Sequence, residues 1–177
     1  AQPAFEDAGG GGAWNLIGSS VASNGDTSLI VTGIDTTYAL FAIGVSDLVV
    51  SGGQNINLRV GTSGGIITSG NDYRFHTQNS EDGDLSYGAI RGEAVSYIYV
   101  SASQPNPAAL VYMDVFAKGA RIWGNWSSSA TGSLNGGQHF SSYVQSADLT
   151  IDRVNITLTQ GAAFTAGRVS VWGIANA

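Results

Sequence analysis

Residues 38–50 read YALFAIGVSDLVV, and residues 56–60 after them read INLRV. The second stretch alternates apolar with polar residues, and this period of two is typical of a half-buried β-strand. The first stretch is almost wholly apolar, which indicates a strand buried on both faces or one that passes from the core into an interface. The segment SGG between them predicts a turn. Strand, turn and strand therefore follow one another here without a helix.

The same pattern extends in both directions along the chain. Further apolar or alternating runs lie at residues 29–31, 73–77, 95–101, 110–116, 121–128, 139–144, 154–158 and 168–174. Turn or loop signals separate them at residues 23–26, 64–65, 104–107, 132–137 and 161–167, and residues 79–93 form the longest stretch without a clean period. Residues 107–118 are the best helix candidate, but Val111, Val115 and the preceding proline favour a strand. Roughly ten to twelve short strands at this spacing predict an all-β fold, a jelly-roll-like antiparallel β-sandwich.

The N-terminal segment differs from the rest of the chain. Residues 1–12 read AQPAFEDAGGGG, and four consecutive glycines cannot pack a core, so they predict a flexible arm. Phe5 is the only large apolar residue on this arm. It is a candidate anchor for a tether that docks on a partner chain, and a disordered tail is the alternative. Residues 13–177 then form a single β-sandwich domain, because no further boundary is visible.

The composition excludes several classes of function. Charged residues make up 11% of the chain, against roughly 25% in a typical soluble domain, and the net charge is -6. The seven lysines and arginines are scattered, whereas a nucleic-acid partner requires clustered cations. The absence of cysteine excludes disulfides and thiolate chemistry. No apolar run approaches the ~20 residues of a membrane-spanning helix, so we expect no membrane insertion.

Catalytic chemistry lacks an identifiable set of residues. The only histidines are His76 and His139, and no strand-to-helix nucleophile elbow accompanies either one. Acidic residues, which could serve as a glycosidase pair or hold calcium, cluster within one expected loop: Glu81, Asp82, Asp84 and Glu93. The spacing of an EF-hand is absent, and solvated charges on a turn explain the cluster. We therefore predict no enzyme, no catalytic residue, no metal and no cofactor.

Aromatic residues are the best candidates for contacts with a partner. Trp123 and Trp126 are three residues apart, so on a strand they face opposite ways, one into the core and one outward. An exposed aromatic ring beside Asn and Ser suits either a sugar-stacking surface or a protein interface. Together with Tyr38 on the apolar strand and Phe5 on the arm, these two tryptophans form the predicted set of interface and anchor residues.

Several segments resemble a family of small virion proteins of tailed phages. These segments are a Trp-bearing strand (AWNLI, 13–17), a glycine-led approach to a long apolar strand (GIDTTY, 33–38), an L-R to G-G stretch (58–65), an S-G-x-x-Y element (SGNDY, 69–73) and a closing strand (GRVSVWG, 167–173). The order and spacing of these segments carry the resemblance, which spans most of residues 13–177. Residues 79–150 match weakly.

The resemblance implies a jelly-roll-like sandwich on the exterior of a phage particle, as a head decoration or fibre component. Such proteins often form homotrimers on the head or tail, and we expect other virion proteins as partners. The resemblance does not say whether the chain touches the host, so a host-surface glycan stays an open candidate partner. The family carries no catalytic motif that maps onto this chain. A glycan- or receptor-binding lectin-like module is the alternative function. Few charges and a surplus of apolar strands also suit symmetric assembly through sheet edges or faces.

Overall fold

The computed structural model describes residues 14–51, 55–68, 73–81, 84–95, 98–101, 106–130, 133–144, 148–158 and 162–175. Every regular element in these ranges is a β-strand, so the predicted all-β class is confirmed. The arm predicted at residues 1–12, with its candidate anchor Phe5, lies outside the described residues.

The described part of the chain contains thirteen strands. The first six are β1 (Trp14–Val21), β2 (Ser28–Thr32), β3 (Tyr38–Val50), β4 (Ile56–Thr62), β5 (Gly65–Ile66) and β6 (Tyr73–Glu81). The other seven are β7 (Asp84–Val95), β8 (Ile98–Ser101), β9 (Asn106–Phe116), β10 (Gly119–Ala130), β11 (Ser133–Val144), β12 (Arg153–Leu158) and β13 (Phe164–Ala175).

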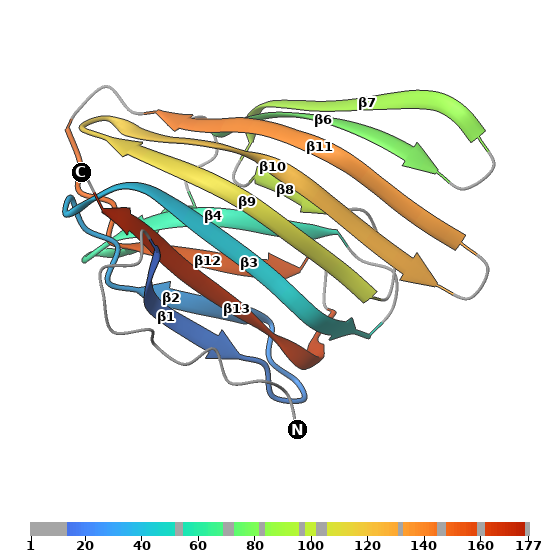
Figure 1. The fold of residues 1–177 in the computed structure, drawn as a ribbon, viewed down its shortest axis with the longest axis horizontal. Coiled ribbons are helices and arrows are strands. Elements are labelled where there is room, and N and C mark those ends of the chain that lie inside the picture. Colours follow the sequence, from blue (N-terminus) through green and yellow to red (C-terminus); the bar gives the residue numbers. More distant parts are fainter. Residues whose placement is uncertain are drawn as a thin grey trace.

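The strands form two antiparallel sheets that pack face to face. The large sheet has the order β1-β13-β3-β9-β10-β11-β6-β7, and the small sheet has the order β2-β12-β4-β5, with β8 also paired to β4. The chain alternates between the sheets from β1 to β4. It crosses again from β5 to β6, from β7 through β8 to β9, and from β11 through β12 to β13. Strands β1, β13, β3 and β9 therefore face β2, β12, β4 and β8, which is the double Greek-key arrangement of a jelly roll. In Figure 1 the large sheet lies in front of β4 and β12.

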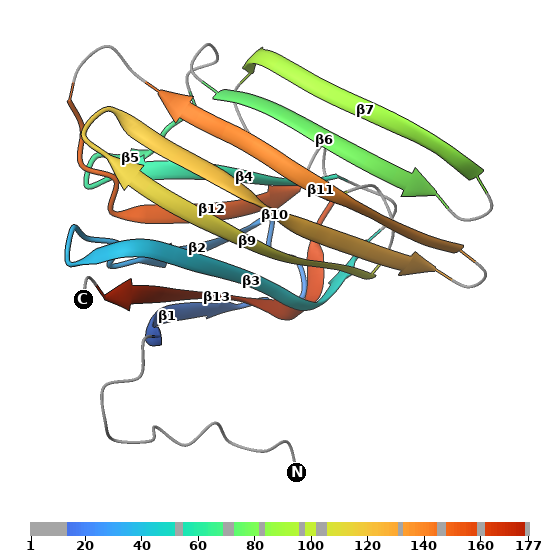
Figure 2. The ribbon, with the colours of Figure 1, turned by 45° about the horizontal axis from the view of Figure 1, so that its top comes forward.

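Two hairpins widen the large sheet beyond this jelly roll. The β6–β7 hairpin is inserted between the small-sheet strands β4 and β8, and β10 and β11 are inserted between β9 and β12. The two insertions pair with each other through β11 and β6. Figure 2 shows β6 and β7 continuing the large sheet past β11.

These insertions correct two of the loop predictions. Residues 79–93 were expected to form a loop that carries the acidic cluster, but β6 runs to Glu81, and β7 begins at Asp84 directly opposite it. Residues 132–137 were also expected to form a loop, yet β11 begins at Ser133. The expected turn at 161–167 is likewise partly strand, because β13 begins at Phe164.

The glycines of β11 serve packing and not a turn. Gly137 lies directly across from Trp126 of β10. A Cβ atom at Gly137 would lie 2.9 Å from the indole Nε1 of Trp126 and 2.1 Å from the carbonyl oxygen of Gln78. Only a residue without a side chain allows the Trp126 ring to lie against the strand at this point. The sequence signal for a loop was therefore a signal for a close aromatic contact.

A β-bulge shifts the side-chain alternation within the largely apolar strand β3. Phe41, Ile43 and Val45 point into the core, and after the bulge Leu48 and Val50 do so instead. Asp47 has a φ of 54°, and Gly167 opposite it has a φ of 113°. A bulge inserts one residue and shifts the side-chain alternation. The core-facing positions therefore do not keep a strict period of two along β3. Ala42, on the opposite face, is also buried, at 2% exposure.

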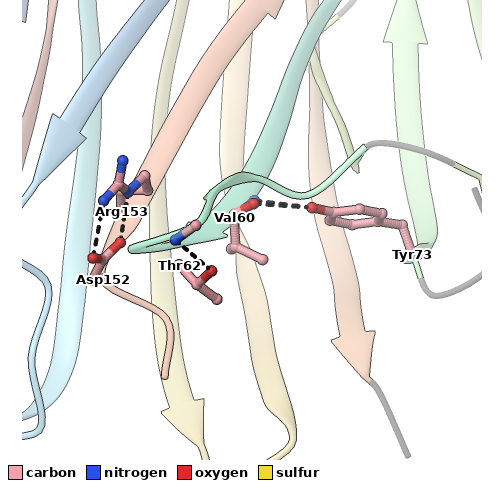
Figure 3. Close-up of polar contacts among 6 residues, drawn as sticks. Val60, Thr62, Tyr73, Asp152 and Arg153 are labelled. Atoms are coloured by element: carbon pink, nitrogen blue, oxygen red, sulfur yellow. Dashed lines mark hydrogen bonds and ion pairs between the residues drawn. The ribbon is translucent and has the colours of Figure 1, made fainter. Parts of the chain in front are cut away.

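The core is one continuous cluster between the sheets, and Tyr73 ties the two sheets together inside it. Its hydroxyl accepts a hydrogen bond from the Val60 amide at 3.1 Å (Figure 3) and donates to the Ile67 carbonyl at 3.0 Å. Its ring also packs against Tyr143, with the ring centroids 4.6 Å apart. The β6 insertion is thereby fastened to strand β4 of the small sheet by a buried polar contact.

Candidate functional site: an aromatic row on the large sheet

The outer face of the large sheet carries a line of aromatic side chains across neighbouring strands. Trp172 of β13 lies opposite Ala42 of β3, which lies opposite Tyr112 of β9. Tyr112 in turn lies opposite Trp123 of β10, and Trp123 opposite Phe140 of β11. Trp14 of β1 joins them, because its ring contacts that of Tyr112. We call Trp14, Trp172, Tyr112, Trp123 and Phe140 the aromatic row.

Regular strand pairing keeps this row aligned. The β3–β9, β9–β10 and β10–β11 pairs show no register shift, so residues directly opposite one another stay on the same face. From β13 to β11 the row crosses four inter-strand steps of about 4.8 Å, which is about 19 Å in all. No described element covers this face in Figure 1.

The rings of the row support one another. The centroid of Tyr112 lies 6.2 Å from those of both Trp14 and Trp123, within the range of stabilising aromatic pairs. Trp172 rests on the backbone of β3, since a Cβ atom at Gly44 would lie 2.9 Å from its ring. Three of the rings are nevertheless accessible: Phe140 is 52% exposed, Trp14 47% and Trp123 36%. The rings are thus positioned before any ligand arrives.

A second line of side chains runs parallel to the aromatic row. Asn125 of β10, Gln138 of β11 and Gln78 of β6 lie opposite one another, and all three are exposed. We call them the amide row. Each lies two residues from a member or neighbour of the aromatic row, or about 7 Å along the strand. A side-chain amide offers two donors and one carbonyl acceptor, so the face combines apolar ring surfaces with neutral hydrogen-bonding groups.

The charges around the two rows largely cancel or lie at the margin. Arg121 and Asp114 lie opposite each other on β10 and β9 and form an ion pair. The Arg121 guanidinium also lies 5.6 Å from the ring centroid of Phe116, a cation–π distance. Arg74 and His76 lie on β6, at the far side of the row from Trp172. The centre of the face is therefore uncharged.

The predicted aromatic residues separate into outer and inner positions. Trp123 faces outward and Trp126 lies in the core at 4% exposure, which confirms that the two tryptophans face opposite ways. A side chain buried as deeply as Trp126 is a core residue and not an interface anchor. Tyr38 is half-buried and packs its ring against Phe41, with the centroids 5.9 Å apart, so it belongs to the edge of the core.

Trp126 takes part in a buried chain of hydrogen bonds beneath the site. Its indole Nε1 donates to the Thr77 hydroxyl at 3.2 Å, and that hydroxyl donates to the carbonyl of Gln138 at 2.9 Å. Three strands of the insertions, β10, β6 and β11, are thereby linked on the inner face. Gln138 carries its side chain outward in the amide row, so this chain supports the site from below.

Among the side chains that the structure describes, the other candidates from the sequence do not form a reactive group. His76 is exposed on the outer face, and its cross-strand neighbours are Phe140 and Arg91, neither of which is a nucleophile. His139 lies in β11 opposite Thr77, and its side chain is outside the described part of the structure. Within the described ranges, no group of three or more His, Asp or Glu residues is placed to hold a metal ion.

Sequence reasoning found Trp123 but missed the other members of the aromatic row. Phe140, Tyr112, Trp14 and Trp172 all appear in predicted strands, and their shared face depends on the strand register. The alternation of side-chain direction along each strand could have found them. Tyr112, for example, lies between the buried residues Val111 and Met113, so its side chain points to the outer face.

Comparison of the chain with protein-family models, curated proteins and solved structures found no match. No helix long and apolar enough to span a membrane occurs among the residues that the structure describes. The residues of the fold themselves must therefore support any functional proposal.

Proposed function

We propose that this chain is a non-enzymatic structural protein on the exterior of a tailed-phage particle, where it assembles as a homo-oligomer with three-fold symmetry. The jelly-roll topology supports this role, since viral capsid domains commonly use that fold. The segments that resemble the virion family lie at strands of the jelly roll. Residues 33–38 lead into β3, residues 58–65 run from β4 to β5, and residues 167–173 lie in β13.

The observation that carries the assembly proposal is an uncharged flank. Strands β1 and β2 are the edges of the two sheets on the same side of the sandwich (Figure 1), and neither contains a charged residue. Leu16 is 60% exposed, Val21 68% and Ile30 42%. Monomeric proteins usually protect such edges with charges or proline. An uncharged edge with exposed apolar side chains instead favours a contact with another chain.

Three-fold assembly places constraints on that contact. A three-fold axis requires a heterologous interface, in which the flank of one copy meets a different surface of the next. The other end of the large sheet is β7, whose sequence includes Asp84, Arg91 and Glu93. Charged residues protect a sheet edge from pairing with another chain. The sequence of β7 therefore differs from that of the flank, which contains no charged residue.

The test is the oligomeric mass of matched variants. We expect wild-type protein to scatter light with three times the 18.2 kDa mass of one chain. Combining Leu16→Lys with Val21→Lys places charges on the flank and should yield monomers. Ala117→Lys adds a charge in the exposed β9–β10 turn and should leave the mass unchanged. A monomeric wild type, or a flank variant that assembles normally, would contradict the proposal.

The particle itself provides the second test. Antibodies against the domain should label purified particles of the phage whose genome encodes this chain, and electron microscopy should place the label on the head or tail. We propose that residues 1–12 fasten the domain to the particle. A variant lacking them should fold and assemble but no longer attach, because every described core residue follows them. Unlabelled particles would refute the virion role.

The non-enzymatic part of the proposal is tested by turnover. We expect purified protein to release no products from polysaccharides under conditions in which it is folded. Release of products that is abolished by changing a single acidic residue would show that the chain is a hydrolase.

A further inference from the structure

We propose that the aromatic row and the amide row together form a binding face for a neutral glycan. The face offers the two chemistries that a sugar ring presents. Exposed rings at Trp123 and Phe140 can stack against the apolar C–H face of a pyranose, and the amides beside them can bond its hydroxyls. This inference does not rest on the assembly proposed for the flank, although the two surfaces adjoin at β1, where Trp14 belongs to the aromatic row and Leu16 lies opposite Trp172.

The amide row decides between a glycan and a protein partner. Asn125, Gln138 and Gln78 lie on paired strands inside the sheet edge, with β7 beyond them, and none takes part in a side-chain hydrogen bond within the described structure. An apolar protein surface laid over them would bury these groups unsatisfied, which is costly. A ligand rich in hydroxyl groups satisfies both their donors and their acceptors.

Electrostatics select a neutral ligand over an acidic one. The whole chain carries a net charge of -6. Arg121, two residues from Trp123 on β10, is already paired with Asp114, and the exposed Arg74 lies at the β6 end of the face. A polyanion such as a nucleic acid or an acidic polysaccharide requires clustered unpaired cations. The two rows are composed only of aromatic and amide side chains, and this composition complements an uncharged chain of sugars.

The face is also built to bind without rearrangement. Tyr112 is held between Trp14 and Trp123, and Trp172 rests on Gly44. The unshifted register of β9, β10 and β11 fixes the spacing between the rows. A surface positioned in advance loses less conformational entropy when its ligand binds. A row that crosses about 19 Å, four strand spacings, suits several linked sugars.

The experiment measures binding of defined oligosaccharides to the protein in its native oligomeric state. A printed array that holds neutral hexose oligosaccharides beside sialylated and uronic-acid glycans identifies the class, and calorimetry with a soluble neutral hit gives Kd per chain. We expect neutral glycans to bind and acidic ones not to bind. Trp123→Ala should weaken Kd by about ten-fold or more, equivalent to about 1.4 kcal/mol, and combining Asn125→Ala with Gln138→Ala should also weaken it.

Matched controls separate binding from folding and from assembly. Val49→Ala removes an exposed apolar side chain from β3 of the same sheet, outside both rows and outside the flank, and it should leave Kd unchanged. Each variant is accepted only if its circular dichroism matches that of the wild type, and Phe140→Ala replaces Trp123→Ala if the latter does not fold.

Three results would overturn the proposal. The first is wild-type protein that binds no glycan on the array or prefers the acidic ones, and the second is glycan binding that Trp123→Ala and Phe140→Ala leave intact. The third is a change of oligomeric mass in Trp123→Ala, which would identify the face as an interface between copies.

Discussion

Replacing Thr77 by valine tests whether the buried chain from Trp126 through Thr77 to Gln138 stabilises the inserted strands. Thr77 is 0% exposed, and its hydroxyl accepts from the Trp126 indole and donates to the Gln138 carbonyl. Valine preserves the shape of the side chain but removes both hydrogen bonds. A buried donor left without a partner costs about 1–3 kcal/mol, so we expect a loss of about 2–3 kcal/mol in the free energy of unfolding.

A double-mutant cycle isolates the contact between the two side chains. Trp126→Phe removes the indole donor, and in that background Thr77→Val loses only the bond to the Gln138 carbonyl, at about 1 kcal/mol. The coupling energy between the two positions should therefore be about 1–2 kcal/mol. Urea unfolding followed by circular dichroism at one fixed protein concentration measures all four proteins, because assembly shifts the apparent stability.

The thermal midpoint provides a second reading of the same change. For a chain of this size about 1 kcal/mol corresponds to about 2–4 °C, so Thr77→Val should lower Tm by about 4–12 °C. If the two substitutions add within about 0.5 kcal/mol, the indole and the hydroxyl are not coupled. The hydrogen-bonded chain would then contribute nothing to holding β6, β10 and β11 together.

Three further predictions concern other parts of the fold. Tyr73→Phe leaves the Val60 amide without its buried partner and should cost about 1–3 kcal/mol in urea unfolding; an unchanged midpoint would contradict this. Gly167→Ala should lower the free energy of unfolding by about 2 kcal/mol or more, because a Cβ there would lie 2.5 Å from the Leu48 Cα at a positive φ. Asp47→Gly should change it by less than about 1 kcal/mol, because glycine adopts a positive φ without strain. Equal losses in the two variants would show that the requirement for glycine at the bulge is not what destabilises Gly167→Ala. The Thr37 side chain and amide lower the pKa of the Asp35 carboxyl below its usual value, so Asp35 stabilises the fold above the unfolded pKa and loses that effect as pH falls through the folded pKa. The stability difference between wild type and Asp35→Asn should therefore shrink below about pH 4. A difference that grows there would show that the pKa of the Asp35 carboxyl is not lowered in the folded protein.

The alternation of apolar and polar residues predicted the strands well, because side-chain direction in a strand is a local property. Residues 38–50 were expected as one strand and form β3 with those bounds. Prediction failed where glycine carried the signal. Gly136 and Gly137 indicated a loop, but Gly137 allows the Trp126 ring to pack on β11. A glycine that makes room for a side chain from a neighbouring strand cannot be recognised without knowing the neighbour.

The candidate site was predictable only in part for a related reason. Parity alone placed Trp123 and Trp126 on opposite faces, and the structure confirms this. The alignment of Trp123 with Phe140 depends on where the β10–β11 turn lies, and the loop expected at residues 132–137 removed that information. Trp14 and Trp172 come from opposite ends of the chain, so their approach to Tyr112 depends on the sheet order, which no local pattern specifies.

The inserted strands separate the two proposed roles within one fold. The flank belongs to β1 and β2 of the jelly roll, whereas Trp123, Phe140 and the whole amide row lie on β6, β10 and β11. These strands are held from below by Trp126, Thr77 and Tyr73, none of which contacts the flank in the described structure. Because distant sites with no shared partners act nearly independently, a substitution under the insertions should perturb the outer face without changing assembly. Under the two proposals, the edge of the jelly roll would contact neighbouring copies, while the inserted strands would provide most of the glycan face.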